Sequence, residues 1–243
     1  MLRTYDLGET DKILVVYSDK EGKLSCVAKG ARKPKGRFAP ASQVFGHYSY
    51  VLHSGRNLDV LSQYQVVRSH KLIGYDLDKY AHASVAAELV NETTHARDPS
   101  PEIFQLLLWV LGSIEDGKNI GAATAVFVLR LLDLLGYRPE LSRCALCGRE
   151  ILKECRFSAE AGGVVCGVCT PEPNAGRGGT RPLSLGALSC LRSLQQPSER
   201  WHVLRLDGDV GECVAAVLEE YIYYRIEKRL KSLEFLKSLS RGK

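Results

Sequence analysis

The sequence lacks an apolar run long enough to cross a bilayer. Its longest runs, Leu106 to Leu111 and Ala122 to Leu129, fall far short of the ~20 residues that a transmembrane helix needs. The first residues also lack the apolar core and cleavage site of a secretion signal. We therefore expect a cytoplasmic protein that makes no contact with a membrane.

The motifs of several common enzyme classes are also missing. There is no G-x-x-x-x-G-K-[ST] phosphate loop, no H-E-x-x-H and no G-x-S-x-G. The histidines are dispersed, and no spacing pairs one of them with a nucleophile. Two close carboxylate pairs, Asp76 with Asp78 and Asp207 with Asp209, fall at turns or helix starts, where we expect caps rather than a catalytic metal site. The sequence offers no candidate catalytic residue, so we expect a protein that is not an enzyme.

Length and composition are those of a folded protein with an uneven charge distribution. At roughly 150 residues per domain, 243 residues suggest one large domain or two unequal ones. Hydrophobic residues make up 45% and charged residues 25%, enough to build a core. The net charge is +5 over residues 1–80, −4 over 81–140 and +4 over 141–243. Basic ends around an acidic middle suit a protein that holds a polyanion with part of its surface, although solvated surfaces also differ by chance.

The apolar pattern changes from strands to helices near Asp76. Runs rich in β-branched and aromatic residues at 13–17, 24–28, 47–52 and 58–67 predict a small antiparallel barrel. Helical periodicity predicts a three-helix bundle over 76–136 and further helices at 183–194 and 212–239, with Gly136 and Pro139 ending the third helix. Residues 1–75 and 76–243 are thus two expected domains, with a connector at 170–180.

Four of the eight cysteines form two C-x-x-C pairs, Cys144 with Cys147 and Cys166 with Cys169. Two such turns can surround one Zn²⁺ with four thiolates, which leaves no open position and makes the metal structural. We expect demanding turns at Gly148 and Gly167 and a hairpin at Gly162–Gly163. An empty reduced site, an iron site and a redox pair are the alternatives. The other cysteines, Cys26, Cys155, Cys190 and Cys213, are expected to be mostly buried small apolar residues.

A basic segment is the candidate nucleic-acid site. Five cations fall within residues 29–38, and no acidic residue lies between Glu21 and Asp59: Lys29, Arg32, Lys33, Lys35 and Arg37. Two glycines and a proline predict an extended or mobile loop that follows a phosphate backbone without reading sequence; a solvated basic loop is the alternative. Nearby aromatic residues could stack unpaired bases or could belong to the core: Phe38, Phe45, Tyr48, Tyr50 and Tyr64.

The C-terminal helix is a second basic region with a less specific signal. Its cations outnumber Glu227 and Glu234: Arg225, Lys228, Arg229, Lys231, Lys237, Arg241 and Lys243. They could extend a nucleic-acid path, or they could be favourable charges near a helix C-terminus.

Several segments, in order over nearly the whole chain, resemble the bacterial recombination and repair protein family RecO: residues 2–12, 28–34, 136–139, 157–169 and 230–236. The resemblance implies an α+β multidomain fold, with an N-terminal OB-fold barrel and a helical domain that carries an inserted four-cysteine zinc module at about 141–170. Family members usually have a short stretch before the segment that matches Leu2-Arg3. We therefore expect either a start upstream of Met1 or an imperfectly closed barrel.

The resemblance also implies a function. Family members bind single- and double-stranded DNA, anneal complementary strands, and act with RecR to help RecA replace single-strand-binding protein at gaps on the nucleoid. Matching positions would assign Lys29, Arg32, Lys33, Lys35 and Arg37 to DNA, and Cys144, Cys147, Cys166 and Cys169 to one Zn²⁺. The alternative is a zinc-stabilised adaptor whose helical domain docks a partner protein and in which DNA binding is secondary.

Overall fold

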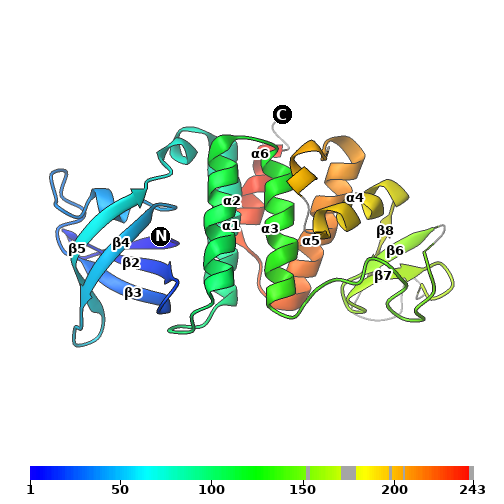
Figure 1. The fold of residues 1–243 in the computed structure, drawn as a ribbon, viewed down its shortest axis with the longest axis horizontal. Helices are drawn as coiled ribbons and strands as arrows, with labels where there is room; N and C mark the ends of the chain where they lie inside the picture. The colour runs from blue at the N-terminus through cyan, green and yellow to red at the C-terminus, as the bar shows by residue number, and fades with distance from the viewer. Residues whose placement is uncertain (152–153, 171–178, 197–198, 205, 241–243) are drawn as a thin grey trace. The chain divides into compact units, whose positions relative to one another are not determined.

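The computed structural model describes residues 1–151, 154–170, 179–196, 199–204 and 206–240 (Figure 1). The chain forms two compact units, one made of Met1–Gly117 with Glu234–Lys243 and the other of Lys118–Leu233. No helix in these described ranges is both long and apolar enough to cross a membrane.

The first unit begins with a five-stranded sheet: β1 (Arg3–Leu7), β2 (Asp11–Ser18), β3 (Gly22–Ala28), β4 (His47–His53) and β5 (Asp59–Arg68). The strand order is β1-β2-β3-β5-β4. Neighbours are antiparallel except β3 and β5, which run parallel. This is the Greek-key topology of an OB fold. The four predicted strands are confirmed, and β1 adds a fifth.

The barrel core follows from the alternation of side chains along the strands. On β3, residues Leu24, Cys26 and Ala28 point inward and their neighbours do not, as the two-residue period of a strand requires. They pack with Leu14, Leu61 and other buried side chains. The outer strands β1 and β4 form no ladder with each other in the described sheet, but the Phe45 N–H donates to the Met1 carbonyl at 3.0 Å.

Two helices follow the barrel in the first unit: α1 (Leu77–Thr93) and α2 (Pro101–Asp116). Asp76 caps α1 by accepting from the Lys79 N–H at 3.1 Å, which confirms its predicted role. The loop between the helices is tied to the barrel through Arg97, whose guanidinium pairs with Glu21 at 2.9 Å and Asp59 at 2.6 Å. Its backbone N–H also donates to the Lys23 carbonyl. The helices are therefore part of the same folded body as the barrel.

The second unit contains α3 (Ile120–Leu134), α4 (Leu185–Gln195) and α5 (Gly208–Ile226), and α6 (Lys231–Ser240) follows. Most of α3 is buried, and it packs with α4 and α5. The expected bundle over 76–136 is thus divided between the two units. Gly136, with φ +80°, ends α3 as predicted. The single helix expected over 212–239 is wrong, because Glu227 adopts φ +57° and ends α5.

A three-stranded sheet in the second unit carries the cysteine pairs: β6 (Cys155–Ser158), β7 (Gly163–Cys166) and β8 (Thr180–Leu183), in the order β7-β6-β8. The predicted hairpin at Gly162–Gly163 is confirmed, with Ser158 opposite Gly163. Residues 171–178 of the expected connector lie outside the described part. Because β8 pairs with β6, the cysteine module extends past residue 170 to Leu183.

Candidate metal centre and nucleic-acid interface

Two tight turns present the cysteine pairs to each other. In the first, the Cys144 carbonyl accepts from the Gly148 N–H at 2.8 Å, and Gly148 has φ +72°, the region that favours glycine. In the second, which follows β7, the Cys166 carbonyl accepts from the Cys169 N–H at 3.0 Å. Gly167 does not adopt a positive φ, so that part of the expectation is wrong. A bond of 2.7 Å from Ala145 N–H to the Val164 carbonyl fixes the first turn on β7.

The four sulfur atoms have the spacing of a metal site. All lie within 4.8 Å of one another, and the Cys147 and Cys166 Sγ atoms are 3.8 Å apart. A tetrahedral ion with metal–sulfur bonds of about 2.3 Å has sulfur–sulfur edges of about 3.8 Å. The arrangement can therefore hold one metal ion on four thiolates, and it is the one such cluster found in the described residues.

The electrostatics of the cluster favour a bound cation. Burial raises the pKa of the Cys144 thiol, but backbone N–H groups of Cys166, Cys147 and Leu146 outweigh it and lower that pKa to about 6. Hydrogen bonds to Cys147 and Cys166, with burial and nearby sulfur charge, raise the pKa of Cys169 to about 12. The site thus favours the thiolate form of Cys144 and disfavours that of Cys169. A bound cation would stabilise both thiolates.

The basic segment is a chain of tight turns, so the expected extended conformation is wrong. Successive N–H groups donate three residues back, from Lys33 to the Gly30 carbonyl at 3.1 Å and from Gly36 to the Lys33 carbonyl at 2.8 Å. A Cβ on Gly36 would overlap the Gly30 carbonyl. The five cations nevertheless all face solvent.

The segment is anchored to the turn between β1 and β2. The Asp11 carboxylate accepts from the Gly30 N–H at 2.8 Å. That bond and the Thr10 hydroxyl lower the pKa of Asp11, helped by the charges of Lys29 and Lys33. Arg32 forms an ion pair with Asp6 at 3.4 Å and donates to the Gly8 carbonyl. No ion pair is found in the described structure for the remaining cations of the segment: Lys29, Lys33, Lys35 and Arg37.

The predicted aromatic platform is only partly available. Phe38 and Phe45 are buried, so of the two alternatives these residues belong to the core. Tyr48 and Tyr50 stack with centroids 5.5 Å apart, and their hydroxyls donate to the carbonyls of Pro40 and Ala41. They therefore hold the residues that directly follow the basic segment. Tyr64 is half-buried and meets Phe38 edge-on at 6.2 Å.

Sequence reasoning missed an exposed pair on β1. The Arg3 guanidinium lies 4.6 Å from the centre of the Tyr5 ring, and both side chains are exposed. Residues two apart on a strand share a face, so alternation within 3–7 was the signal that could have revealed this pair.

The C-terminal cations occupy two helices and the link between them. Arg225 lies in the last turn of α5, Lys228 and Arg229 in the link, and Lys231 and Lys237 in α6. Arg241 and Lys243 lie outside the described residues.

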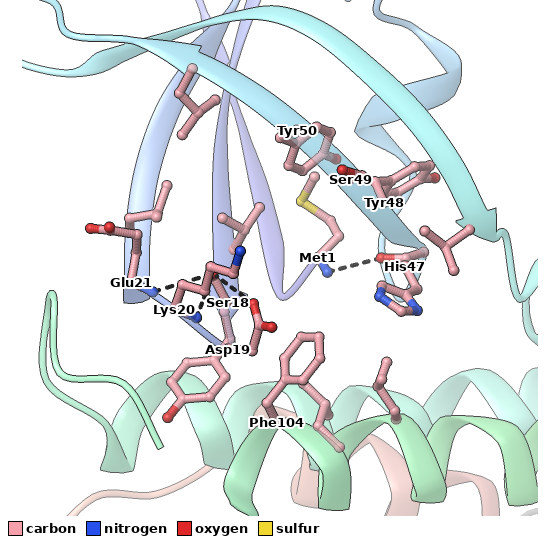
Figure 2. A pocket seen from close by; sticks show the side chains of 18 of the residues that line it. Met1, Ser18, Asp19, Lys20, Glu21, His47, Tyr48, Ser49, Tyr50 and Phe104 are labelled. Atoms are coloured by element: carbon pink, nitrogen blue, oxygen red, sulfur yellow. Dashed lines mark hydrogen bonds between the residues drawn. The ribbon is translucent and has the colours of Figure 1, made fainter. Parts of the chain in front are cut away.

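A cavity of about 760 Å³ lies between one end of the barrel and α2. Figure 2 shows Phe104 reaching from α2 toward the turn at 18–21, with Tyr48 and Tyr50 on the other wall. Its one arginine, Arg97, is neutralised by Glu21 and Asp59. The cavity therefore offers a weaker case for an anion site than the exposed basic segment does.

Comparison with known proteins gives matches to one family along nearly the whole chain. The models "Recombination protein O N terminal" and "Recombination protein O C terminal" match residues 1–70 and 74–234. A DNA repair protein RecO of Symbiobacterium thermophilum is 40% identical, covering 98% of this chain and 95% of that protein. Proteins of the same name from Pelotomaculum thermopropionicum and Desulfitobacterium hafniense strain DCB-2 are 35% and 34% identical, covering 97% and 96% of this chain and 91% and 85% of their own lengths. The chain therefore belongs to the recombination protein O (RecO) family.

Proposed function

We propose that this protein is a non-catalytic DNA repair mediator. It binds single- and double-stranded DNA, anneals complementary strands, and acts with RecR to help RecA replace single-strand-binding protein at gaps. Family membership and the name of its relatives, DNA repair protein, support the general role. The observation that carries DNA binding is the row of exposed cations on one anchored segment beside an OB-fold barrel: Lys29, Arg32, Lys33, Lys35 and Arg37.

The anchoring explains how these cations would act. The contacts of Gly30 with Asp11 and of Arg32 with Asp6 hold the cations in place before DNA binds. Less conformational entropy is therefore lost on binding than with a mobile loop. Arg32 also keeps the segment on the β1–β2 turn through Asp6. The other four cations are available for phosphates. At about 0.7 per contact, they give single-strand binding a salt slope of up to about 3.

We propose one structural Zn²⁺ on Cys144, Cys147, Cys166 and Cys169. An ion with four thiolate ligands has no open position for water, so its role is to hold the module together. In this proposal residues 1–75 form the DNA-binding domain, and residues 76–243, with the inserted module, form the part that meets partner proteins.

The test replaces the four available cations by alanine together, Lys29, Lys33, Lys35 and Arg37, and measures affinity for an oligo-dT at several salt concentrations. We expect the slope of log affinity against log salt to fall by up to about 3, with annealing slowed in parallel. The matched control removes the same charge at exposed cations elsewhere: Lys20, Arg56, Lys71 and Lys118. An unchanged slope in the first variant, or an equal loss in the control, would exclude this segment as the DNA site.

A second candidate function is the zinc-stabilised adaptor. Leu146 and Val168, one in each cysteine turn, are 58% and 81% exposed, and exposed apolar side chains at a rigid site suit a protein contact. Changing both to serine should leave DNA affinity intact. If RecR or single-strand-binding protein is then no longer retained by the full-length protein, the adaptor function is supported; unchanged retention excludes this surface.

A further inference from the structure

Three tyrosine rings surround one arginine at the C-terminal end of α5. The Arg225 guanidinium lies 5.6, 4.9 and 5.4 Å from the ring centres of Tyr137, Tyr221 and Tyr224. Tyr221 is buried, but Tyr137 and Tyr224 are 43% and 41% exposed. The guanidinium therefore lies near one buried ring and near two rings that keep much of their surface in water.

The neighbouring positions repeat this chemistry. The Arg229 guanidinium lies 5.7 Å from the ring of Tyr223, which is 50% exposed. Residues 225–231 contain four cations and one carboxylate, Glu227. Neither arginine forms an ion pair within the described part of the chain, and the buried Nε of Arg225 has no hydrogen-bond partner there.

Packing accounts for part of this arrangement. A cation near the end of α5 is favourable because of the helix dipole, and the Tyr221 hydroxyl donates to the Tyr137 carbonyl at 3.1 Å. These contacts explain the buried Tyr221 and the position of Arg225. They do not explain three tyrosines that stay 41% to 50% exposed beside two arginines without an ion pair in the described residues.

We propose that this tyrosine–arginine surface, made of Tyr137, Tyr223, Tyr224, Arg225 and Arg229, binds single-stranded DNA. Unpaired bases stack on the exposed tyrosine rings, and the guanidinium groups donate to phosphates. The inference rests on the proposed function and extends it. The basic segment of the first unit contacts the phosphate backbone alone, whereas this surface of the second unit contacts bases as well. Exposed aromatic rings beside guanidinium groups match a ligand that carries both flat bases and phosphates, so single-stranded nucleic acid is favoured over an acidic protein segment.

The first test separates base contacts from phosphate contacts. The zinc-loaded full-length variant Tyr137→Leu/Tyr224→Leu is compared with wild type on an oligo-dT and on an abasic oligonucleotide of equal length. Loss of one stacked base predicts binding about tenfold weaker on oligo-dT, with little change on the abasic strand. Tyr75→Leu, a change at a tyrosine that is 84% exposed in the first unit, is the matched control. Equal affinities for the variant and wild type on both strands would overturn the proposal.

The second test does not depend on a variant that folds. Wild-type protein is irradiated with an oligonucleotide carrying 5-bromodeoxyuridine, and the adducts are mapped by mass spectrometry. We expect adducts on peptides that contain Tyr137 or the Tyr223-Tyr224 pair. Adducts confined to residues 1–75 would overturn this inference and leave the proposed function standing. No binding by wild type even in dilute buffer would instead overturn the proposed function.

Discussion

The absence of a side chain at Gly22 lets the barrel contact the loop before α2. Gly22 has φ +66° and begins β3, and a Cβ at this position would overlap the backbone of Asp98. Gly22→Ala should therefore lower the free energy of unfolding of the first unit by about 2 to 4 kcal/mol, from strained backbone and overlap together. Urea unfolding followed by Trp109, in α2, measures this effect in a Trp201→Phe background.

Gly74→Ala is the control for this prediction. Gly74 lies in a short helical turn of the same unit, without a positive φ, and a Cβ there would meet no atom within 4 Å. It should change the free energy of unfolding by less than about 0.5 kcal/mol. If the two alanine variants were equally stable, the close approach of Gly22 to Asp98 would not occur in solution.

Single residues were predictable where their chemistry acts through spacing in the chain. Two C-x-x-C turns at this spacing are typical of one shared metal site, so the cluster of Cys144, Cys147, Cys166 and Cys169 could be predicted from the sequence. The burial of Phe38 and Phe45 was harder to predict, because the local sequence around an aromatic residue beside a strand does not show whether it is buried or exposed. Their burial depends on how the turns after β3 fold back over the barrel, which no local pattern specifies.

Among the elements, the sheet β7-β6-β8 is the one whose folding stability should depend on a bound metal ion. Its strands have four residues each, and the first cysteine turn is tied to β7 through Ala145 and Val164. A structural Zn²⁺ site contributes roughly 10 to 16 kcal/mol of binding free energy in small domains. Chelation should therefore lower the local opening free energy of the Ala145 and Val164 amides by at least about 3 kcal/mol, measured by hydrogen exchange.

The amides of β2 and β3 are the internal reference, since they belong to the first unit and should keep their protection. Cys147→Ser should lose the bound zinc, measured by metal analysis, whereas Cys190→Ser, at a cysteine outside the cluster, should keep one equivalent. Protection that survives chelation at Ala145 and Val164 would show that the module folds without metal.

Apolar periodicity predicted the strands and helices that have a regular pattern along their length. It missed the break between α5 and α6 and the short strand β8. Strands β2 to β5 and helices α2 to α4 have clear apolar patterns and turn residues at their ends. The break between α5 and α6 lies at Glu227, which adopts the left-handed conformation although no glycine or proline marks the position. Strand β8 holds a proline at position 182 and sits at an edge of its sheet, where such residues are tolerated.

At the scale of the whole molecule, composition indicated two parts but could not show how the helices are shared. The proposed division near residue 75 follows the change from strands to helices. Compactness groups α1 and α2 with the barrel, because Arg97 joins Glu21 and Asp59 and the loop before α2 pairs with β3. These contacts join residues far apart in the chain, so a pattern confined to neighbouring residues does not contain them.

A second long-range cluster joins the end of β5 to α2 and should govern acid stability. The Glu115 carboxylate bonds the buried His70 Nδ1 at 3.0 Å and Arg68 at 2.8 Å. Burial lowers the pKa of His70 against the opposing effect of Glu115. Burial raises the pKa of Glu115, but Arg68 and His70 outweigh it, and the net pKa is below its usual value. Near neutral pH, an uncharged His70 therefore donates to a charged Glu115.

Both shifts make the folded state bind fewer protons than the unfolded state, so stability must fall with falling pH. The loss attributable to His70 begins below its unfolded pKa of about 6.5, and that of Glu115 below about 4.3. In His70→Gln the free energy of unfolding, followed by Trp109 in urea, should therefore decline less between pH 7 and 5 than in wild type. His95→Gln, at an exposed histidine of the same unit, should follow wild type. Parallel declines in wild type and His70→Gln would place the acid sensitivity elsewhere, because the one buried histidine of the described structure would then contribute nothing to it.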